Sequence, residues 1–309
     1  MPLHPQARQF LDTIEAAGLP TLPELSPPDG RAQAAILNDI VGPGPEVAVV
    51  ENFTIDVDGG SIAARRYEPA EAAATILWIH GGGWTICDLD SHDAMCRVLA
   101  NASSCRVIAV DYRLAPEHPF PIPLEDCWAA LRWAAEQYEH QPLVLGGDSA
   151  GGNMTAVLAQ RARDRGGPEL ALQVLVYPAT DFTMNDSPSM QAYGSGPETF
   201  LTRAEMEWFE ANYITDEAQR EDPEVSPLKA QSLSGLSPAI VVTARYDPLC
   251  DQGVAYAERL SAEGVAVTHH HYDDQIHAFF GFVNLFDSAN EAVPKVGREI
   301  HDAVASAVA

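Results

Sequence analysis

The chain has 309 residues, 46% of them hydrophobic, which is enough to bury a large core in one α/β domain with an attached subdomain. Its formal net charge is −26, and a field of that sign repels nucleic acid and anionic membrane surfaces. An odd number of cysteines in mostly apolar stretches favours reduced, buried thiols over a disulfide framework. These cysteines are Cys87, Cys96, Cys105, Cys127 and Cys250.

The first 46 residues contain helical patterns but no strand pattern. Apolar residues recur at helical spacing from Gln6 to Ala17 and from Arg31 to Val41, and prolines separate the two segments. Residues 1–19 contain charged side chains and no continuous apolar run, so we expect neither a signal peptide nor a membrane span. The expected compartment is the cytoplasm, and we expect the two helices to form part of a lid.

From residue 47 onward the pattern is that of an α/β sheet. Residues 47–57 and 61–67 alternate or are β-branched, and Asp58-Gly59-Gly60 between them predicts an antiparallel hairpin at one edge. Short apolar strands then alternate with helical segments, which predicts a mostly parallel sheet with helices on both faces. The strands expected are 75–79, 106–110, 143–145, 172–176, 239–243 and 265–272, and the helices 92–102, 124–139, 154–163, 254–262 and 292–308.

Residues 182–237 interrupt this alternation and are too many for an ordinary loop. The segment has a turn-rich half, 185–197, and a helical half, 203–213, in which Met206 and Phe209 lie roughly on one side. We expect it to be the second part of the lid. The predicted organisation is therefore N-terminal cap helices at 1–46, core at 47–181, a cap insertion at 182–237 and the rest of the core at 238–309.

A serine stands at the centre of the sequence Gly-Gly-Asp-Ser-Ala-Gly-Gly-Asn, residues 146–153. This stretch follows an apolar strand and opens a helix, the context of a G-x-S-x-G nucleophile elbow. Gly147 and Gly151 flank Ser149, and a side chain at either position would crowd so sharp a turn. Ser149 is therefore the candidate nucleophile.

A glycine loop, His80-Gly81-Gly82-Gly83-Trp84, follows the strand that ends at Ile79. Such a run leaves backbone N–H groups able to approach a ligand, and lipases and esterases use this loop as half of an oxyanion hole. The loop at 116–123 contains four prolines, which would stiffen it as a support for the glycine loop. A purely structural turn explains those prolines equally well.

Acyl transfer by serine also requires a base and an acid that orients it, and in α/β hydrolases these follow the serine in the order acid, then histidine. Asp247 lies just beyond a predicted buried strand, where the loops of a parallel sheet gather, whereas Asp181 is the second choice and Asp251 is expected to cap a helix. His277, in the loop after the last strand, is the expected base. A metal site at His269-His270-His271 is not expected, because consecutive strand residues point to opposite faces.

Five segments together resemble the bacterial hormone-sensitive-lipase-like esterases, family IV of the bacterial esterases. They are residues 80–84, 111–121, 147–153, 247–249 and 276–277, and the resemblance extends from about residue 47 to the end. It implies an α/β-hydrolase fold with a helical cap and a triad of Ser149, Asp247 and His277. The oxyanion donors implied are the backbone N–H groups of Gly82, Gly83 and Ala150.

The resemblance further implies a serine carboxylesterase that acts on short-chain acyl esters through an acyl-enzyme, without a cofactor, and makes a homodimer plausible. Candidate substrate-binding residues are Trp84, Met206 and Phe209, each of which could equally pack the lid against the core. A serine amidase or deacetylase would use the same triad, so that alternative stays open. A non-catalytic receptor, such as the plant gibberellin receptors, would be expected to lose the base, which is present here as His277.

Three residues depart from the family pattern. Cys250 and Gln252 stand where basic and acidic residues are usual, and Ala278 stands where a glycine usually follows the histidine. None of them removes a catalytic group. They put local packing and the flexibility of the loop after His277 in question.

Overall fold

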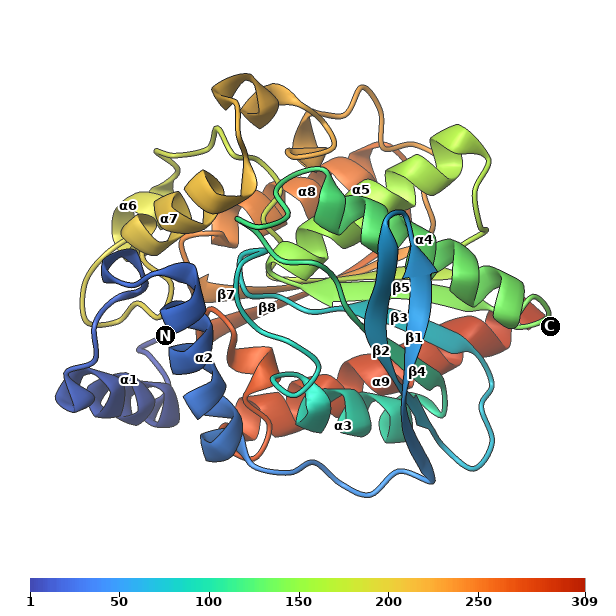
Figure 1. The fold of residues 1–309 in the computed structure, drawn as a ribbon, viewed down its shortest axis with the longest axis horizontal. Coiled ribbons are helices and arrows are strands. Elements are labelled where there is room, and N and C mark those ends of the chain that lie inside the picture. Colours follow the sequence, from blue (N-terminus) through green and yellow to red (C-terminus); the bar gives the residue numbers. More distant parts are fainter. Residues whose placement is uncertain (309) are drawn as a thin grey trace.

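The fold is built on one eight-stranded sheet, shown in Figure 1 by a computed structural model that describes residues 1–308. The strand order is β1-β2-β4-β3-β5-β6-β7-β8; the first two neighbouring pairs are antiparallel and all the others parallel. The predicted α/β fold with a mostly parallel sheet is therefore confirmed. The strands are β1 Val49–Val57, β2 Gly60–Glu68, β3 Thr75–Ile79, β4 Arg106–Asp111, β5 Leu143–Asp148, β6 Leu172–Val176, β7 Ala239–Tyr246 and β8 Val267–Ile276.

The hairpin of β1 and β2 forms the antiparallel edge that the turn signal predicted. Val57 pairs with Gly60, so Asp58 and Gly59 make a two-residue turn. Gly59 has a φ of 78°, a conformation that this kind of turn requires and that glycine adopts without steric cost.

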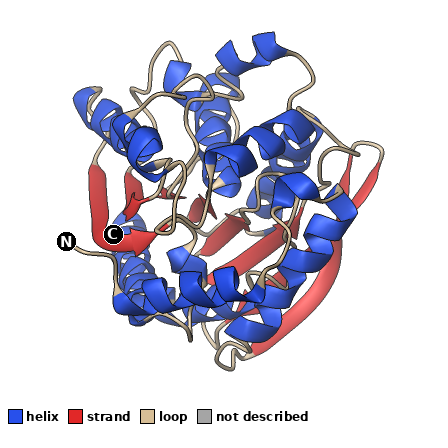
Figure 2. Cartoon of the chain, turned by 90° about the vertical axis from the view of Figure 1, so that its left-hand side faces the viewer, coloured by secondary structure: helices blue, strands red, loops and turns tan. Residues whose placement is uncertain are grey.

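Helices cover both faces of the sheet (Figure 2). In β3 every residue is buried, with Ile76 and Trp78 packed in one cluster and Leu77 and Ile79 in another. This alternation follows from the two-residue period of a strand and explains why the predicted strands read as continuous apolar runs. The first cluster includes α3 Asp93–Ser103 and α9 Asp287–Val308, and on the opposite face lie α4 Ile122–Gln137, α5 Ala150–Arg165 and α8 Cys250–Ala262.

Four further helices gather at one side of the molecule, at the left of Figure 1. They come from the two segments in which a lid was expected. Their bounds are α1 Pro5–Ala17, α2 Pro27–Val41, α6 Pro188–Tyr193 and α7 Arg203–Tyr213, and the short 3₁₀ helices are η1 Leu22–Glu24, η2 Glu217–Glu221, η3 Pro227–Lys229 and η4 Phe279–Gly281.

Near α6 one local expectation is incomplete and another is wrong. The turn-rich stretch 185–197 also contains this six-residue helix, which was not expected and whose first turn is capped by Ser187. Asp251 does not cap α8 but lies inside its first turn, and its Oδ2 accepts the backbone N–H of Ser189 at 2.7 Å. Asp251 therefore stabilises the start of α6, a contact that depends on the tertiary fold.

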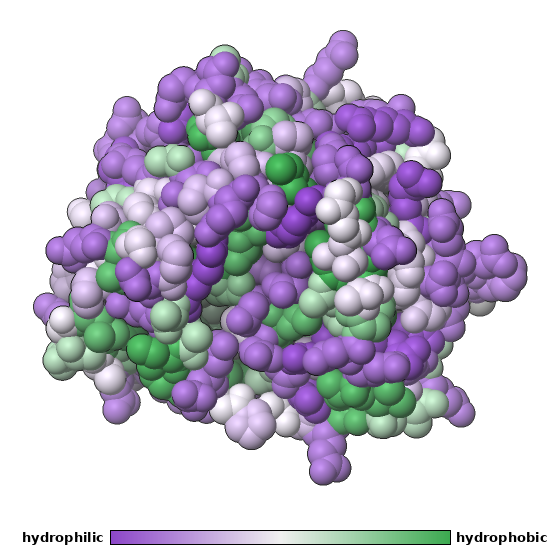
Figure 3. All heavy atoms as spheres, in the orientation of Figure 1, coloured by the Kyte–Doolittle hydropathy of each residue, from purple (hydrophilic) through white to green (hydrophobic). Residues whose placement is uncertain are grey.

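The surface is mostly hydrophilic on the face shown in Figure 3, with apolar side chains gathered over α1 and α2. Leu19, Ile36 and Ile40 are among the exposed apolar residues. Among residues 1–308, no helix has both the length and the apolar character needed to span a bilayer.

Candidate active site

Ser149 lies at the turn between β5 and α5 with an unusual backbone conformation, φ 55° and ψ −115°. Its N–H donates to the carbonyl of Val176 at 2.8 Å, and its own carbonyl accepts the N–H of Asn153 at 2.9 Å, so both sides of the residue are held. A Cβ at Gly151 would overlap the carbonyl oxygen of Ile79. The glycine is thus required for the close approach of α5 to β3.

The structure brings the three predicted triad residues together. His277 follows β8 directly and its Nε2 lies 2.9 Å from Ser149 Oγ, while its Nδ1 lies 2.7 Å from Asp247 Oδ2. Asp247 follows β7 and is fully buried, and its Oδ1 accepts the N–H of Leu249 at 2.8 Å. A hydroxyl, an imidazole and a carboxylate in this chain of contacts can pass a proton from the serine to the histidine.

The alternative candidates lie elsewhere. Asp181 accepts hydrogen bonds from Thr183 and lies 3.7 Å from Lys229 Nζ, with no contact to His277. His269 and His271 both contact the hydroxyl of Thr243. Across the described residues 1–308, no group of three or more histidine, cysteine or carboxylate side chains is arranged to hold a metal ion.

The glycine loop folds into a tight turn beside the serine. Gly82 and Gly83 have φ values of 97° and 54°. The carbonyl of Gly82 accepts the N–H groups of Thr85 and Ile86, and the hydroxyl of Thr85 donates to the carbonyl of Gly83 at 3.0 Å. The carbonyl groups of Gly82 and Gly83 are therefore occupied by hydrogen bonds from the residues that follow the loop. Within residues 1–308 the N–H groups of Gly82, Gly83 and Ala150 donate to no acceptor. Ala150 is the first residue of α5, so the positive end of the helix dipole lies at this place as well.

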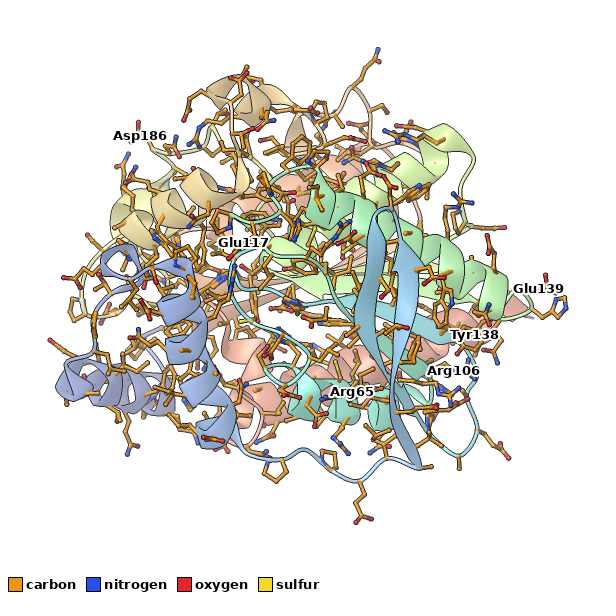
Figure 4. The ribbon with its side chains drawn as sticks, viewed as in Figure 1. Arg65, Arg106, Glu117, Tyr138, Glu139 and Asp186 are labelled. Atoms are coloured by element: carbon orange, nitrogen blue, oxygen red, sulfur yellow. The ribbon has the colours of Figure 1, made fainter. Side chains whose placement is uncertain are left out.

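One support of this loop was missed by sequence reasoning. Arg31 of α2 donates from Nε to the carbonyl of Thr85 at 2.8 Å and from its guanidinium to the carbonyl of Ala115 at 2.9 Å. Glu117 holds the other edge of the guanidinium beside α2 (Figure 4), and this hydrogen bond lowers the pKa of Glu117 to about 2. The contact joins the N-terminal helices to the glycine loop and to the proline-rich loop. No local pattern around Arg31 signals it.

A cavity of about 1000 Å³ opens onto Ser149 and His277. Trp84, Met206 and Phe209 all line it, and all three are also packed in the apolar cluster between the α7 segment and the sheet. The two roles left open for these residues are therefore not exclusive. Phe10 of the lid also lines the cavity, as the sequence led us to expect, but sequence reasoning did not find the aromatic residues that pack with it. Phe10, Phe200, Phe282 and Phe286 form a group in which ring centroids lie 4.9–5.7 Å apart.

Two of the three departures from the family pattern have local explanations. Gln252 accepts the backbone N–H groups of Thr180 and Asp181 at 2.8 and 3.1 Å, a task that an uncharged amide oxygen can perform. Burial raises the pKa of the Cys250 thiol to about 12, so this side chain is an inert apolar filler. Ala278 adopts a left-handed conformation with φ 66°, which favours glycine, so nothing in its conformation explains the alanine.

Comparison with known proteins gives the same picture. A profile of the α/β-hydrolase fold matches residues 76–281. The chain is 44% identical to a carboxylic ester hydrolase, LipN, from Mycobacterium tuberculosis, covering 79% of this chain and 67% of that protein. It is 38% identical to an ethyl acetate hydrolase from Pseudomonas putida, covering 96% and 98%. A hyperthermophilic esterase from Pyrobaculum calidifontis superposes with a TM-score of 0.92 at 38% identity, covering all of both chains. The protein therefore belongs to the α/β-hydrolase fold family, in its hormone-sensitive-lipase-like branch.

Proposed function

We propose that the protein is a serine carboxylesterase with Ser149 as nucleophile, His277 as general base and Asp247 as the acid that orients it. The observation that carries the proposal is the contact of Ser149 Oγ with His277 Nε2 at 2.9 Å, beside N–H groups that are free to bind an oxyanion. The ester hydrolases among its relatives support the same chemistry. No contact in the cavity favours an amidase or a deacetylase.

In the proposed reaction, Ser149 Oγ attacks the ester carbonyl carbon as its proton passes to His277 Nε2. Asp247 keeps the Nδ1–H tautomer and stabilises the imidazolium. The N–H groups of Gly82, Gly83 and Ala150 bind the oxyanion of the tetrahedral intermediate. The imidazolium then protonates the departing alkoxide to give an alcohol and an acyl-enzyme. Water, deprotonated by His277, releases the carboxylic acid and restores Ser149.

The substrate class that we infer is an uncharged ester with a short acyl chain. The apolar lining of the cavity, with Trp84, Met206 and Phe209 near the glycine loop, suits an apolar acyl or alcohol group. The net charge of −26 disfavours anionic substrates. We also propose that residues 1–46 and 182–237 act together as the cap, because both contribute side chains to the cavity wall.

The test is covalent labelling with a fluorophosphonate, followed by mapping of the modified peptide, in parallel with turnover of p-nitrophenyl esters. We expect the label on Ser149 alone, and we expect Ser149→Ala to lower turnover by a factor on the order of 10⁴ or more. Substantial activity in Ser149→Ala, or a label on another serine, would refute the assignment. An activity maximum at the decanoate or a longer ester would overturn the short-chain class, and faster turnover of matched anilides would favour the amidase.

A further inference from the structure

A second contact between an imidazole and a carboxylate lies directly behind the proposed nucleophile. His92, the residue before α3, places Nε2 at 3.0 and 3.2 Å from the two carboxylate oxygens of Asp148, the residue before Ser149. Asp148 also accepts a hydrogen bond from Trp78 Nε1 at 3.3 Å. His92 is 8% exposed and Asp148 7%. The proposed hydrolysis gives neither side chain a role.

The hydrogen bonds around His92 favour its charged form. Ser91 Oγ donates its single proton to the carbonyl of Asp88 at 2.7 Å and accepts the N–H of Asp88 at 3.0 Å. His92 Nδ1 lies 2.9 Å from the same oxygen, which has only a lone pair left for it. With Ser91 Oγ donating to Asp88, Nδ1 carries a proton, and Nε2 carries another toward the carboxylate of Asp148. The network is complete only when His92 is an imidazolium.

The charged and titratable groups around His92 favour that form. Burial opposes the charge on His92, but the carboxylate of Asp148, its hydrogen bond and Asp88 raise the pKa of His92 above its ordinary value. His80 faces it from the end of β3, with ring centroids 5.6 Å apart, and burial lowers the pKa of His80 to about 4, which leaves it neutral. Burial raises the pKa of the Cys87 thiol to about 12, so it too is neutral.

Asp148 connects this pair to the reaction centre. Its side chain lies against the glycine loop, because a Cβ at Gly81 would be 2.5 Å from Asp148 Oδ2. Its backbone leads directly to Ser149 and to the N–H of Ala150. A negative charge at this place opposes the growth of an oxyanion on the substrate, and a neighbouring cation offsets it.

We propose that protonated His92 is a positioning residue that holds Asp148 against the glycine loop and neutralises it, so that loss of the His92 proton lowers esterase activity at alkaline pH. This inference rests on the proposed function. When His92 is neutral, Nδ1 can only accept a hydrogen bond, and Ser91 has to abandon the carbonyl of Asp88 to supply one. Asp148 then keeps its charge beside the oxyanion donors without compensation.

The sign of the pH dependence follows from the direction of the shift. A raised pKa means that His92 keeps its proton to a higher pH than an ordinary histidine and loses it as the pH rises through that pKa. The result is an alkaline limb in kcat/KM that is separate from the acidic limb expected of the general base.

Two variants test this limb. Ser91→Ala removes the acceptor of Nδ1–H, a contact that favours the charged form of His92, so we expect the alkaline limb to move to lower pH. His92→Gln keeps an N–H donor within reach of Asp148 but has no proton to lose. We expect it to be about tenfold less active at neutral pH and to lack this limb, the loss corresponding to one charge-assisted hydrogen bond. His301→Gln, exposed on α9, is the matched control and should keep the wild-type profile.

The profile is recorded both as kcat/KM on a p-nitrophenyl ester and as the rate of fluorophosphonate labelling of Ser149, which needs no turnover. In parallel, histidine ring nitrogens are observed by NMR in the wild-type protein, and His92 is assigned by its absence from His92→Gln. We expect both of its nitrogens to be protonated at neutral pH. An unprotonated ring nitrogen at neutral pH, or the same alkaline limb in wild type and both variants, would overturn the proposal. Failure of the proposed esterase activity would instead appear as an absence of turnover and of Ser149 labelling.

Discussion

At the amino ends of the parallel strands buried polar groups are paired with one another, whereas at the carboxyl ends backbone donors face a cavity. Arg106, at the start of β4, donates to Glu68, to Thr75 Oγ1 at 3.1 Å and to Gln141 Oε1 at 2.8 Å. Its guanidinium also lies 3.9 Å from the ring centre of Tyr138, and Figure 4 shows the two side by side. At the other end the N–H groups of the glycine loop are held in place with no acceptor among residues 1–308.

Backbone strain is distributed in the same unequal way. Seven non-glycine residues in the described chain have positive φ values, and five of them line the cavity. Such conformations cost energy and persist only where the surroundings enforce them. The comparison indicates that one end of the sheet mainly stabilises the fold while the other is held in a costly arrangement suited to chemistry. The five residues are Trp84, Cys87, Ser149, Tyr177 and Ala278.

The largest effect is expected from Asp247→Asn at the carboxyl end. The amide has nearly the same shape but can turn an N–H group toward His277 Nδ1, which favours the wrong imidazole tautomer. We expect kcat to fall by a factor on the order of 10⁴ with little change in the unfolding midpoint. Asp181→Asn is the control, because it removes the other candidate acid, and turnover should change by less than about threefold. A greater loss in Asp181→Asn would reverse the choice between the two acids.

Arg106→Met at the amino end should lower the stability of the fold and leave kcat unchanged, the reverse of the result expected for Asp247→Asn. The change leaves the carboxylate of Glu68, the buried hydroxyl of Thr75 and the half-buried amide of Gln141 without their common donor. We expect a loss of about 2 to 3 kcal/mol in the free energy of unfolding, measured by denaturant titration, with kcat unchanged. Arg66→Met, which breaks a more exposed pair with Glu51, should cost less than about 1 kcal/mol. A large fall in kcat in Arg106→Met would contradict the separation of the two ends.

Gly83→Ala tests the contact between the glycine loop of the core and α7 of the proposed cap. The residue has a φ of 54°, and a Cβ there would overlap the ring of Phe209 on α7. We expect kcat/KM to fall by about tenfold. The double variant with Phe209→Ala should recover part of that loss, because it removes the ring that the new Cβ would overlap.

Gly82→Ala is the matched control for this pair. Its Cβ would overlap the carbonyl oxygen of Ile86, which is backbone and cannot move aside. Phe209→Ala should therefore restore nothing in that background. Equal recovery in both double variants would show that Phe209 acts on the glycine loop in some other way than by contact with Gly83.

Most of the fold could be predicted because its signals are local. The strand 75–79 and the helix 203–213 have the predicted bounds, since each is marked by periodic apolar residues and clear ends. The short helix α6 could not be predicted, because six residues carry too little periodicity and begin in a turn-rich stretch. The contact of Asp251 with α6 spans 62 residues of sequence, so no local pattern could indicate it.

The candidate site likewise contains residues that could be predicted from the sequence and residues that could not. Ser149, Asp247 and His277 could be selected because a strand end, a motif and chain order each restrict the choice, and the structure brings them into contact. Arg31 and His92 could not be selected, because their partners Thr85 and Asp148 lie 54 and 56 residues away. Only the folded chain shows which arginine or histidine supports the reaction centre. The roles of all these residues remain predictions, and the substitutions above test those of Ser149, Asp247 and His92.

The smallest effect is expected from Ala278→Gly, and its sign is informative. Ala278 follows His277 and has a φ of 66°, a conformation that costs an L-residue roughly 1 kcal/mol or more and costs glycine nothing. Glycine also gains entropy in the unfolded chain, which offsets about 0.4 to 1 kcal/mol. The net result should be a stabilisation of less than about 1 kcal/mol, with kcat changed by less than about twofold.

Ala32→Gly in α2 makes the same chemical change where the backbone is helical and the side chain exposed. It should destabilise the protein by up to about 1 kcal/mol, because glycine is a poor helix former. The two variants should therefore shift the unfolding midpoint in opposite directions. If Ala278→Gly destabilises as Ala32→Gly does, the left-handed turn after His277 is not strained, and the catalytic end holds less stored energy than its φ values suggest. Opposite shifts would show that this chain keeps an alanine there at a cost in stability, in a place where glycine would relieve it.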